Sequence, residues 1–247
     1  MKKVLVFSLN YYPRFIGGAE VAIKEITDRI KPEDIEFHVV TLRVDSNLPV
    51  EERIANTIVH RIGAARPNPP IADLKKYPLH LLKHWYQFGA FFAALRLHRK
   101  YHFDGTWAMM AHSCGIPAGL FKTFHPEVKY LLTLQEGDPP EHIERLAKPV
   151  WSLFKRGFTT ADAIQPISTF LLNWGRRMGF KGSAEIIPNA VNAKHFAHDY
   201  SAEEIAARQE KLGKKPGDVF VVTTSRLVHK NAIDDMIRAL PLLPDNM

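Results

Sequence analysis

The sequence is poor in cysteine and has no long hydrophobic run. A single cysteine, Cys114, stands among 247 residues, which excludes a disulfide framework and any zinc site built from several cysteines. No stretch approaches the roughly 18 uninterrupted apolar residues of a membrane-spanning helix. The apolar run at the amino terminus is too short for a secretory signal and is followed by Asn10 and Arg14. We therefore expect a cytoplasmic protein.

Two further absences narrow the classes of function. The dinucleotide-binding pattern G-x-G-x-x-G does not occur, although it marks a large class of nucleotide-binding folds. Acidic residues are fewer than basic ones, 26 against 33, which gives a formal net charge of +7. Such a charge permits anionic partners such as nucleotides, lipid headgroups or nucleic acid, without choosing among them.

The segment from Lys2 to Ile30 is the first feature that suggests a site. Val4–Leu9 is apolar at successive positions, which is typical of a buried parallel strand. Gly17 and Gly18 follow it and precede a helical pattern. Glycine lets a ligand approach the backbone, and the free N–H groups at a helix start attract anions. The segment predicts either a phosphate-binding turn or a tight turn without a ligand.

Strand and helix patterns alternate through most of the chain. Repeated alternation predicts an α/β fold, a doubly wound parallel sheet with helices on both faces. The expected strands are Val4–Leu9, Ile35–Leu42, Thr57–Ile62, Thr106–Met110, Lys129–Leu134 and Ala163–Pro166. The main expected helices are Pro78–Lys100, Ile116–Phe124, Glu141–Phe158 and Thr169–Met178, the last with Ser168 as its N-cap.

A change of pattern near Gly182–Ala184 divides the sequence into two parts. We expect a Rossmann-like domain at residues 1–184 and the beginning of a second one at residues 185–247. The second part offers helices at Ser201–Leu212 and Ala232–Leu240 around a strand at Val219–Thr224. One strand and two helices cannot close a sheet core, so the second domain is expected to be begun and not finished. Either the chain is a fragment or its reading frame is truncated.

Three short motifs occur in order along the chain. They are G-G-A-E at residues 17–20, I-P-N-A-V-N at residues 187–192 and T-S-R-L-V-H-K-N at residues 224–231. Together they resemble glycosyltransferase family 4, whose motifs are G-G-x-E, I-P-N-G-V-D and G-R-L-x-x-x-K-G. The resemblance implies the GT-B fold of two facing Rossmann-like domains, with Pro188 and Asn189 at the hinge between them.

The same resemblance implies an activity. Family 4 enzymes move a sugar from a nucleotide-diphosphate donor with retained anomeric configuration. The acceptor would be a glycan, such as a cell-envelope polysaccharide, or a lipid-linked sugar. The resemblance also implies that no metal ion or other cofactor is needed, and the lack of a clear D-x-D pattern agrees with that expectation.

Arg226 and Lys230 are the predicted ligands of the diphosphate. They follow the expected strand Val219–Thr224 and precede a helix, so both could point into the cleft at the carboxyl end of a parallel sheet. An arginine fork and a lysine point charge can neutralise a diphosphate as the sugar leaves. The alternative is a pair of solvated surface cations. The resemblance further implies that Gly17 and Gly18 line the cleft beneath the diphosphate.

The candidate catalytic residues stand where the sequence departs from the family pattern. A strand of the family's first domain is commonly followed by histidine in a context like T-x-H-G, whereas this chain has T-L-Q-E-G-D at residues 133–138. Glu136 and Asp138 are therefore candidates for binding a sugar hydroxyl or acting as a base, and Gln135 also falls at this place. Their alternative role is to form a turn ahead of two prolines. His112, after an earlier strand, is a further candidate, with a purely structural role as its alternative.

A second departure concerns the donor site. The family's E-x7-E pair, whose carboxylates meet the donor sugar and ribose, does not occur downstream of the Arg226–Lys230 turn. Glu25/Glu33 and Glu136/Glu144 have this spacing by accident, since both lie in the first domain. We therefore expect this polypeptide to be inactive in glycosyl transfer by itself.

The stretch from Lys75 to Phe103 contains no acidic residue. The helix expected within it, at residues 78–100, carries one apolar row made of Leu81, Trp85, Phe88, Phe92 and Leu95. A basic amphipathic helix with aromatic side chains can lie on an anionic membrane surface, here the inner face of the membrane. Family members with lipid-linked acceptors often have such a surface in the first domain. The alternative is a core helix that packs on the sheet and keeps a solvated basic back.

Two other classes of function remain open. A nucleic-acid-binding module could use the same basic helix, but no such motif occurs and the charge is confined largely to one segment, so no nucleic-acid partner is expected. A non-catalytic protein that uses its unfinished second domain as an interaction surface is the other class. The sequence as a whole favours a family 4 glycosyltransferase whose donor domain is cut short.

Overall fold

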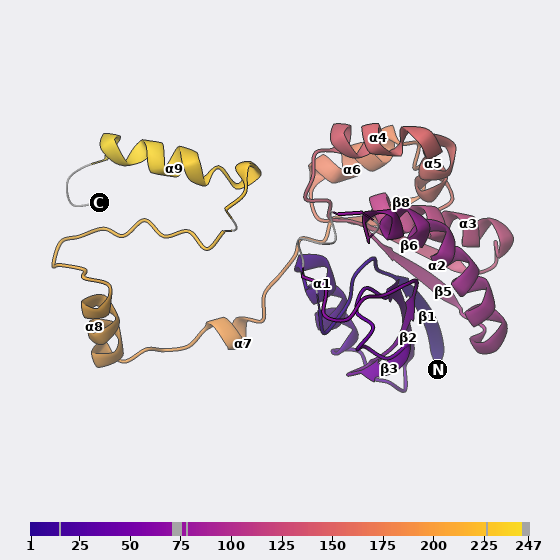
Figure 1. The fold of residues 1–247 in the computed structure, drawn as a ribbon, viewed down its shortest axis with the longest axis horizontal. Helices are drawn as coiled ribbons and strands as arrows, with labels where there is room; N and C mark the ends of the chain where they lie inside the picture. The colour runs from indigo at the N-terminus through magenta and orange to yellow at the C-terminus, as the bar shows by residue number, and fades with distance from the viewer. Residues whose placement is uncertain (15, 71–75, 78, 226, 244–247) are drawn as a thin grey trace. The chain divides into compact units, whose positions relative to one another are not determined.

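The chain forms two compact units, Met1–Asn189 and Ala190–Met247 (Figure 1). The structure is a computed structural model that describes residues 1–14, 16–70, 76–77, 79–225 and 227–243. The first unit, called unit 1, holds all the strands within these ranges. The second, called unit 2, consists of short helices and extended segments.

Unit 1 is built on an eight-stranded sheet in the order β3-β4-β2-β1-β5-β6-β7-β8. Every neighbouring pair is parallel except β3 and β4, which are antiparallel. The central strands are apolar at consecutive positions because helices bury both faces of a parallel sheet. The strands are β1 (Lys2–Phe7), β2 (Ile35–Leu42), β3 (Glu51–Ile54), β4 (Thr57–Ile62), β5 (Gly105–Met109), β6 (Lys129–Leu134), β7 (Ala163–Pro166) and β8 (Ser183–Ala184).

Helices cover both faces of this sheet (Figure 1). Val6 of β1 packs in one core with Ile23, whereas Leu5 and Phe7 point to the opposite core. The expected doubly wound arrangement is therefore confirmed. The helical segments of unit 1 are α1 (Gly18–Thr27), α2 (Leu79–Tyr101), the π-helix η2 (Ala111–Gly115), α3 (Ile116–Phe124), α4 (Pro140–Ala147), the 3-10 turn η3 (Lys148–Val150), α5 (Trp151–Thr159) and α6 (Thr169–Arg177).

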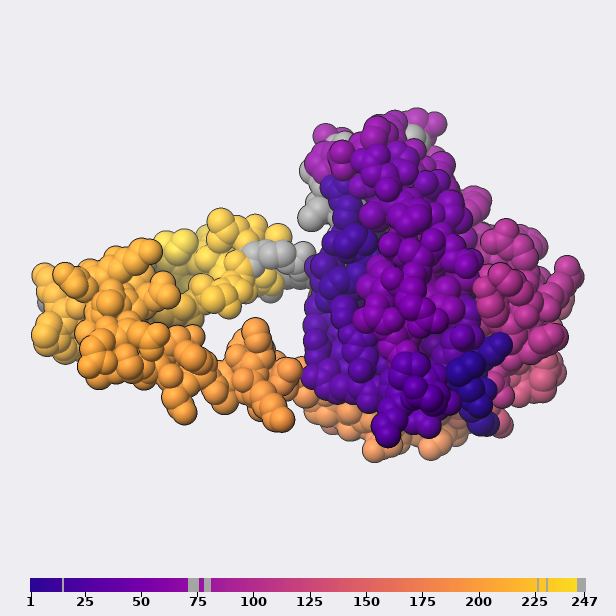
Figure 2. All heavy atoms as spheres, turned by 90° about the horizontal axis from the view of Figure 1, so that it is seen from below, coloured from indigo at the N-terminus to yellow at the C-terminus, as the bar shows by residue number. Residues whose placement is uncertain are grey.

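The two cores differ in size. The smaller core lies under α1 and includes Phe37, Val39, Val59 and Trp107. Figure 2 shows a face of unit 1 that is formed mainly by the amino-terminal part of the chain, drawn in indigo and purple. The larger core joins α2, α3, α4, α5 and α6 to the other face of the sheet.

Most predicted elements of unit 1 are confirmed, one is wrong, and the edge strands β3 and β8 lie outside the prediction. Four strands, β2, β4, β6 and β7, have the predicted bounds, and the Ser168 hydroxyl caps α6 by accepting from the Leu171 N–H. The helix predicted at Glu141–Phe158 is wrong as one element, because Pro149 falls in its interior and splits it into α4, η3 and α5. The edge strand β3 was not predicted, since its sequence E-E-R-I is mostly polar.

Helix α2 buries a different side from the one that its apolar row predicts. Its buried residues are Tyr86, Ala90, Phe91, Ala93, Ala94 and Leu97. The row itself faces outward, with exposed fractions of 46% at Leu81, 46% at Trp85, 41% at Phe88 and 65% at Phe92. The helix thus packs in the core against the sheet, as the alternative predicts, but it does so through other residues than this row. Because α2 is apolar on both sides, periodicity could not choose between them.

Unit 2 contains α7 (Ala193–Phe196), α8 (Ala202–Lys211), the 3-10 turn η4 (His229–Asn231), α9 (Ile233–Ala239) and the 3-10 turn η5 (Leu240–Leu242). Helix α8 begins with a capping box in which the Ser201 hydroxyl and the Glu204 carboxylate each accept a backbone N–H. The strand predicted at Val219–Thr224 is wrong: this segment is extended but pairs with no strand within the described residues. A strand forms only when a neighbour satisfies its backbone groups.

The division between the units falls at Asn189, a few residues after the predicted one at Ala184. Residues after β8 stay bound to the sheet of unit 1. The Glu185 N–H donates to the Ile164 carbonyl, and the Ile187 N–H donates to the Pro166 carbonyl at 3.0 Å. The Gln165 side chain donates to the Ile187 carbonyl at 2.7 Å.

Glycines bring α5 against the segment formed by η2 and α3. A Cβ on Gly157 would lie 2.8 Å from the carbonyl carbon and oxygen of Gly115, and a Cβ on Gly119 would lie 3.0 Å from the Gly157 backbone. Contacts under 3.0 Å are not tolerated without movement, so only glycine permits this approach. The contact fixes η2, which follows directly on β5.

We expect Gly157→Ala to lower the free energy of unfolding of unit 1 by about 1–3 kcal/mol, because the added methyl overpacks a backbone contact. Urea denaturation followed by tryptophan fluorescence measures this, since all four tryptophans lie in unit 1. Gly18→Ala is the matched control, because a Cβ at Gly18 meets nothing within 4 Å. Equal stability of the Gly157 variant and the wild type would contradict this packing.

Candidate functional site at the carboxyl edge of the sheet

The order of the strands places a switch point between β1 and β5. From β1 the chain moves outward to β2 and β4, and it then returns to β5 and continues outward through β6, β7 and β8 on the other side. The connections after β1 and β5 thus diverge at the carboxyl ends of these strands, which is where open α/β sheets have their ligand crevice. The segments that follow β1, β5 and β6 supply the side chains at this edge.

Glu136, just after β6, contacts the segment that follows β5. Its Oε1 accepts a hydrogen bond from the Ala111 N–H at 2.5 Å. Its Oε2 is buried and has no hydrogen-bond partner among the described residues. Burial raises the pKa of the Glu136 carboxyl to about 7, although the backbone N–H groups around it favour the charged form. The carboxyl thus caps the helical segment that begins at Ala111.

His112 lies in this capped segment, η2. Met110 before it has a positive φ of 68°, a costly conformation for a non-glycine residue. The His112 carbonyl accepts from the Gln87 side chain of α2 at 3.2 Å. Burial lowers the pKa of the His112 imidazole, and the Asp138 carboxylate opposes this shift. Lys83, His84 and His142 also act electrostatically on the imidazole and favour its neutral form.

The structure therefore brings the three candidate catalytic residues to one edge. The Asp138 carboxylate, in the segment after β6, acts electrostatically on the His112 imidazole, whereas the Glu136 carboxylate accepts the backbone N–H of the residue before His112. One carboxyl oxygen of Glu136 accepts the Ala111 N–H, and the other is buried. Glu136 therefore has a capping role in addition to its predicted catalytic role. The catalytic roles of all three residues stay predictions.

Gly17 and Gly18 lie at the same edge, where α1 begins after β1. The Gly17 N–H donates to the Glu20 carboxylate at 2.6 Å. Glu20 is buried, and burial raises the pKa of its carboxyl. An anion that reached this helix start would meet that carboxylate, so phosphate binding by Gly17 and Gly18 requires Glu20 to be protonated or to move aside. Phosphate binding by the two glycines therefore stays a prediction, and it requires this change at Glu20.

Two features of the site are not predicted from the sequence: the first is the capping role of Glu20, and the second is the π-helix η2. A signal for the first was present, since a glutamate three residues after the helix N-cap is one half of a capping box. The second depends on a contact between Glu136 and a backbone group 25 residues away. No local pattern reports such a contact.

The remaining predicted site residues lie in or next to unit 2. Arg226 lies outside the described residues, and Lys230 belongs to η4, where only its backbone is described. Pro188 and Asn189 are exposed and stand at the end of unit 1. Their predicted roles, diphosphate binding and hinge, stay predictions.

One cluster in unit 1 has the composition of a metal site. Ligand atoms of His98, His125 and Glu127 lie within 4.8 Å of one another. The Nδ1 of His98 accepts the Phe103 N–H at 3.1 Å, which leaves the proton of a neutral imidazole on Nε2 and opposes metal binding there. His125 in turn bonds the Glu127 carboxylate through its Nδ1 at 3.1 Å, so the residues fit separately hydrogen-bonded imidazoles better than a metal ion. No helix within the described ranges is long and apolar enough to cross a membrane.

A mostly parallel sheet, wound on both faces and with its crevice at a switch point, defines unit 1 as a Rossmann-like domain of the GT-B type. The family model described as Glycosyltransferase Family 4 matches residues 16–195. The chain belongs to this family. No curated protein sequence matches it.

Solved structures with the same fold include several glycosyltransferases. Sucrose-phosphate synthase from Thermosynechococcus elongatus is 14% identical with a TM-score of 0.70, over 99% of this chain and 60% of that one. Anabaena HepE, solved with UDP and glucose, is 16% identical with a TM-score of 0.60, over 100% of this chain and 59% of that one. An α,α-trehalose-phosphate synthase from Burkholderia xenovorans, solved with glucose-6-phosphate, is 13% identical with a TM-score of 0.56, over 85% of this chain and 53% of that one. The chain thus matches at most about 60% of the length of these proteins.

Substitution of Glu136 separates its capping contact from its ionisation. Glu136→Ala removes both, and we expect it to lower the free energy of unfolding by about 1–3 kcal/mol because the Ala111 N–H loses its acceptor. Glu136→Gln keeps an acceptor and removes the ionisation. In the wild type the pKa rises from 4.5 unfolded to about 7 folded, so the stabilisation is complete below pH 4.5 and is lost as the pH rises through 7.

The measurement is urea denaturation of the wild type and Glu136→Gln at a series of pH values. Between pH 4.5 and 8 we expect the stability of the wild type to fall relative to Glu136→Gln by up to about 3 kcal/mol. The comparison cancels the opposite contribution of His60, whose pKa burial lowers to about 4 in both proteins. A difference that does not change with pH would show that Glu136 has an ordinary pKa.

Proposed function

We propose that this chain forms the acceptor side and the start of the donor side of a retaining glycosyltransferase. The enzyme would move a sugar from a nucleotide-diphosphate donor to a glycan or to a lipid-linked acceptor, without a metal ion. The observation that carries this proposal is that His112, Asp138 and Glu136 lie at the same edge of the sheet as the glycine turn at residues 17–18, at the switch point of a family 4 domain. The ligands of the structural relatives, UDP with glucose and glucose-6-phosphate, support a nucleotide-sugar donor and a sugar acceptor.

His112 is the group best suited to meet the acceptor hydroxyl. Its imidazole is half-buried and burial lowers its pKa, so it is neutral near pH 7 and can accept a proton or a hydrogen bond. The Asp138 carboxylate favours the charged form of this imidazole and would stabilise any charge that it gains. Arg226 and Lys230 would hold the donor diphosphate and stabilise the charge that grows as the sugar leaves.

Nucleotide binding tests the donor part of this proposal. We expect calorimetric titration with UDP, GDP and ADP to show binding of at least one, and Arg226→Ala or Lys230→Ala to weaken it by about tenfold or more, since a hydrogen bond to a charged group contributes about 1.5–3 kcal/mol. Lys211→Ala, on the exposed surface of α8, is the control with the same change of charge. If no nucleotide binds, or if the control weakens binding equally, the assignment of the donor site fails.

The outward row on α2 supports the lipid-linked form of the acceptor. Leu81, Trp85, Phe88 and Phe92 are exposed on a helix whose only charged side chains are basic. Apolar rings can enter the headgroup layer while Arg96, Arg99 and Lys100 meet anionic lipid. We therefore propose that this surface lies against the inner face of an anionic membrane.

Vesicle co-sedimentation tests the membrane surface. We expect stronger binding to mixed phosphatidylcholine–phosphatidylglycerol vesicles than to pure phosphatidylcholine, because basic residues near the surface each add about 1 kcal/mol. The double variant Phe88→Ser and Phe92→Ser should reduce binding by about tenfold or more. Phe170→Ser is the control, because Phe170 is 63% exposed on α6, away from this row. The proposal is refuted if vesicle binding does not depend on anionic lipid, or if the double variant binds as strongly as the wild type.

A further inference from the structure

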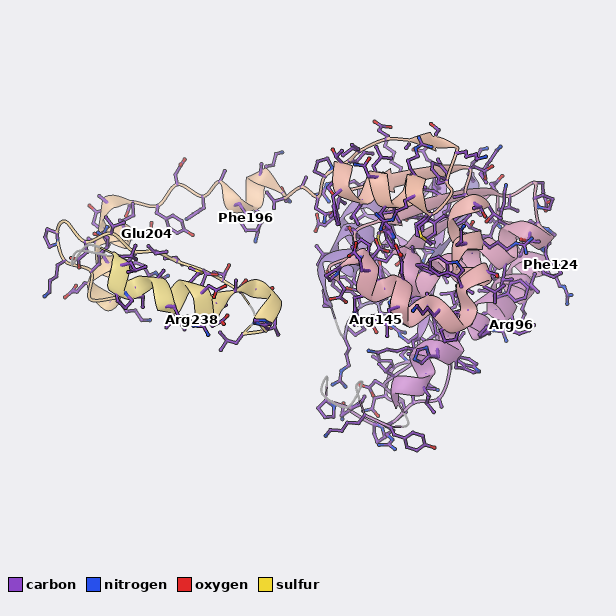
Figure 3. All side chains as sticks on the ribbon, turned by 90° about the horizontal axis from the view of Figure 1, so that it is seen from above. Arg96, Phe124, Arg145, Phe196, Glu204 and Arg238 are labelled. Carbon is purple, nitrogen blue, oxygen red and sulfur yellow. The ribbon has the colours of Figure 1, made fainter. Side chains whose placement is uncertain are left out.

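A hollow on the outer side of α4, η3 and α5 belongs to none of the functions above. Its volume is about 800 Å³, and it is lined by Glu141, Glu144, Arg145, Lys148 and Trp151. All five residues lie in unit 1, and Figure 3 labels Arg145 on α4. A volume of this size is in the range of small-molecule sites. We call it the α4–α5 hollow.

Trp151 provides a fixed aromatic wall. Its ring packs against Phe154, with the ring centroids 6.0 Å apart, and Phe154 is itself buried. Trp151 itself remains 37% exposed. A tryptophan held from one side and open on the other offers a rigid apolar surface at little entropic cost on binding.

Glu144 provides a fixed acceptor in the same hollow. Its Oε1 accepts from the Trp174 indole N–H at 2.9 Å and from the Arg177 guanidinium at 3.0 Å. Trp174 is buried in the core, so the carboxylate is anchored to the body of unit 1. An anchored carboxylate accepts hydrogen bonds from hydroxyl groups without losing much side-chain freedom.

Arg145 and Lys148 provide positive charge that the protein does not neutralise. Arg145 follows Glu141 by four residues, a spacing that usually gives an ion pair on a helix. Glu141 instead pairs with Arg177, and its Oε1 lies 3.9 Å from the Arg177 Nη2. Within the described part of the chain, neither the Arg145 nor the Lys148 side chain has an ion pair or a hydrogen bond. Both cations therefore remain available to an anionic ligand.

We propose that the α4–α5 hollow binds a saccharide that carries a carboxylate or phosphate group. The apolar C–H face of a sugar ring would pack on Trp151, because this removes apolar surface of both from water. Its hydroxyl groups would donate to Glu144, and its acidic group would pair with Arg145 and Lys148. The fixed carboxylate favours a ligand rich in hydroxyl donors over a nucleotide, whose base has few donors to offer it.

Such a site would hold an acidic glycan outside the crevice at the carboxyl edge of the sheet. The inference goes beyond the proposed function and does not depend on it, because none of its residues takes part in donor binding or in the steps assigned to His112. If no nucleotide binds, the proposal for the α4–α5 hollow still stands. If no acidic saccharide binds in the hollow, the proposed donor site still stands.

The experiment is a titration followed by the indole N–H resonance of Trp151 in a nitrogen-15 spectrum of the full chain, assigned with Trp151→Phe. The acidic probes are tetragalacturonate, for a carboxylate, and glucose 1-phosphate, for a phosphate. We expect at least one of them to shift the resonance saturably. Maltotetraose, a neutral tetrasaccharide, should bind at least about tenfold more weakly, the factor that 1.4 kcal/mol represents.

Matched variants assign the binding to the side chains. The double variant Arg145→Ala and Lys148→Ala should weaken acidic-probe binding by about tenfold or more. The control, Lys155→Ala with Arg156→Ala, removes the same charge from exposed positions on α5 that do not line the hollow and should change affinity by less than about twofold. Intrinsic fluorescence should show loss of binding in Trp151→Ala and its retention in Trp151→Phe, because phenylalanine keeps an aromatic surface.

Several results would overturn the proposal. An affinity for maltotetraose equal to that for the acidic probes would show that the acidic group does not contribute to binding. Equal weakening by the control double variant would show a diffuse effect of net charge. Saturation by inorganic phosphate alone, or tighter binding of uridine monophosphate than of both acidic sugars, would show an anion or nucleotide site instead. Melting temperatures of all variants within a few degrees of the wild type exclude unfolding as the cause of any loss.

Discussion

The hydrogen bond from the Ala111 N–H to the Glu136 carboxylate ties together the ends of β5 and β6. Without it, the segment after β5 would begin a helix with a buried, unsatisfied donor next to the strained Met110. The bond also fixes where η2 starts, and the glycine contact with α5 fixes where it ends. Between these two constraints lies His112, so its position follows from backbone packing and from one buried side chain.

Burial acts on Glu136 and His112 in the same direction, toward their neutral forms. It raises the pKa of the carboxyl to about 7 and lowers the pKa of the imidazole below its ordinary 6.5. The usual order of the two groups is thus reversed, and the neutral acid and the neutral imidazole coexist near neutral pH. A site that disfavours charge in this way suits an uncharged hydroxyl acceptor, whose proton can move to an imidazole that carries none.

The sequence predicts those parts of this structure that local pattern controls. Segments rich in apolar and β-branched residues located β2, β4, β6 and β7, because strands buried by helices on both faces of a sheet are enriched in such residues. The pattern failed at Val219–Thr224, where an apolar run has no partner strand among the described residues, and at α2, where both sides of the helix are apolar. At the site, the positions of Glu136, Asp138 and His112 followed from strand ends. The capping role of Glu136 is a contact with a backbone group far along the chain, which no local motif encodes.

The other buried histidines of unit 1 show why His112 stands apart. His38 binds His60 through Nδ1 at 2.9 Å and Glu36 through Nε2 at 3.0 Å, and the second nitrogen of His60 pairs with Glu51 at 3.1 Å. His98 has its Nδ1 engaged by the Phe103 N–H. In the described part of the chain, no hydrogen bond holds the ring nitrogens of His112. The histidines with a structural role have their ring nitrogens hydrogen-bonded within the protein. The half-buried ring of His112 has no such bond within the described ranges, which supports the proposal that it meets a substrate.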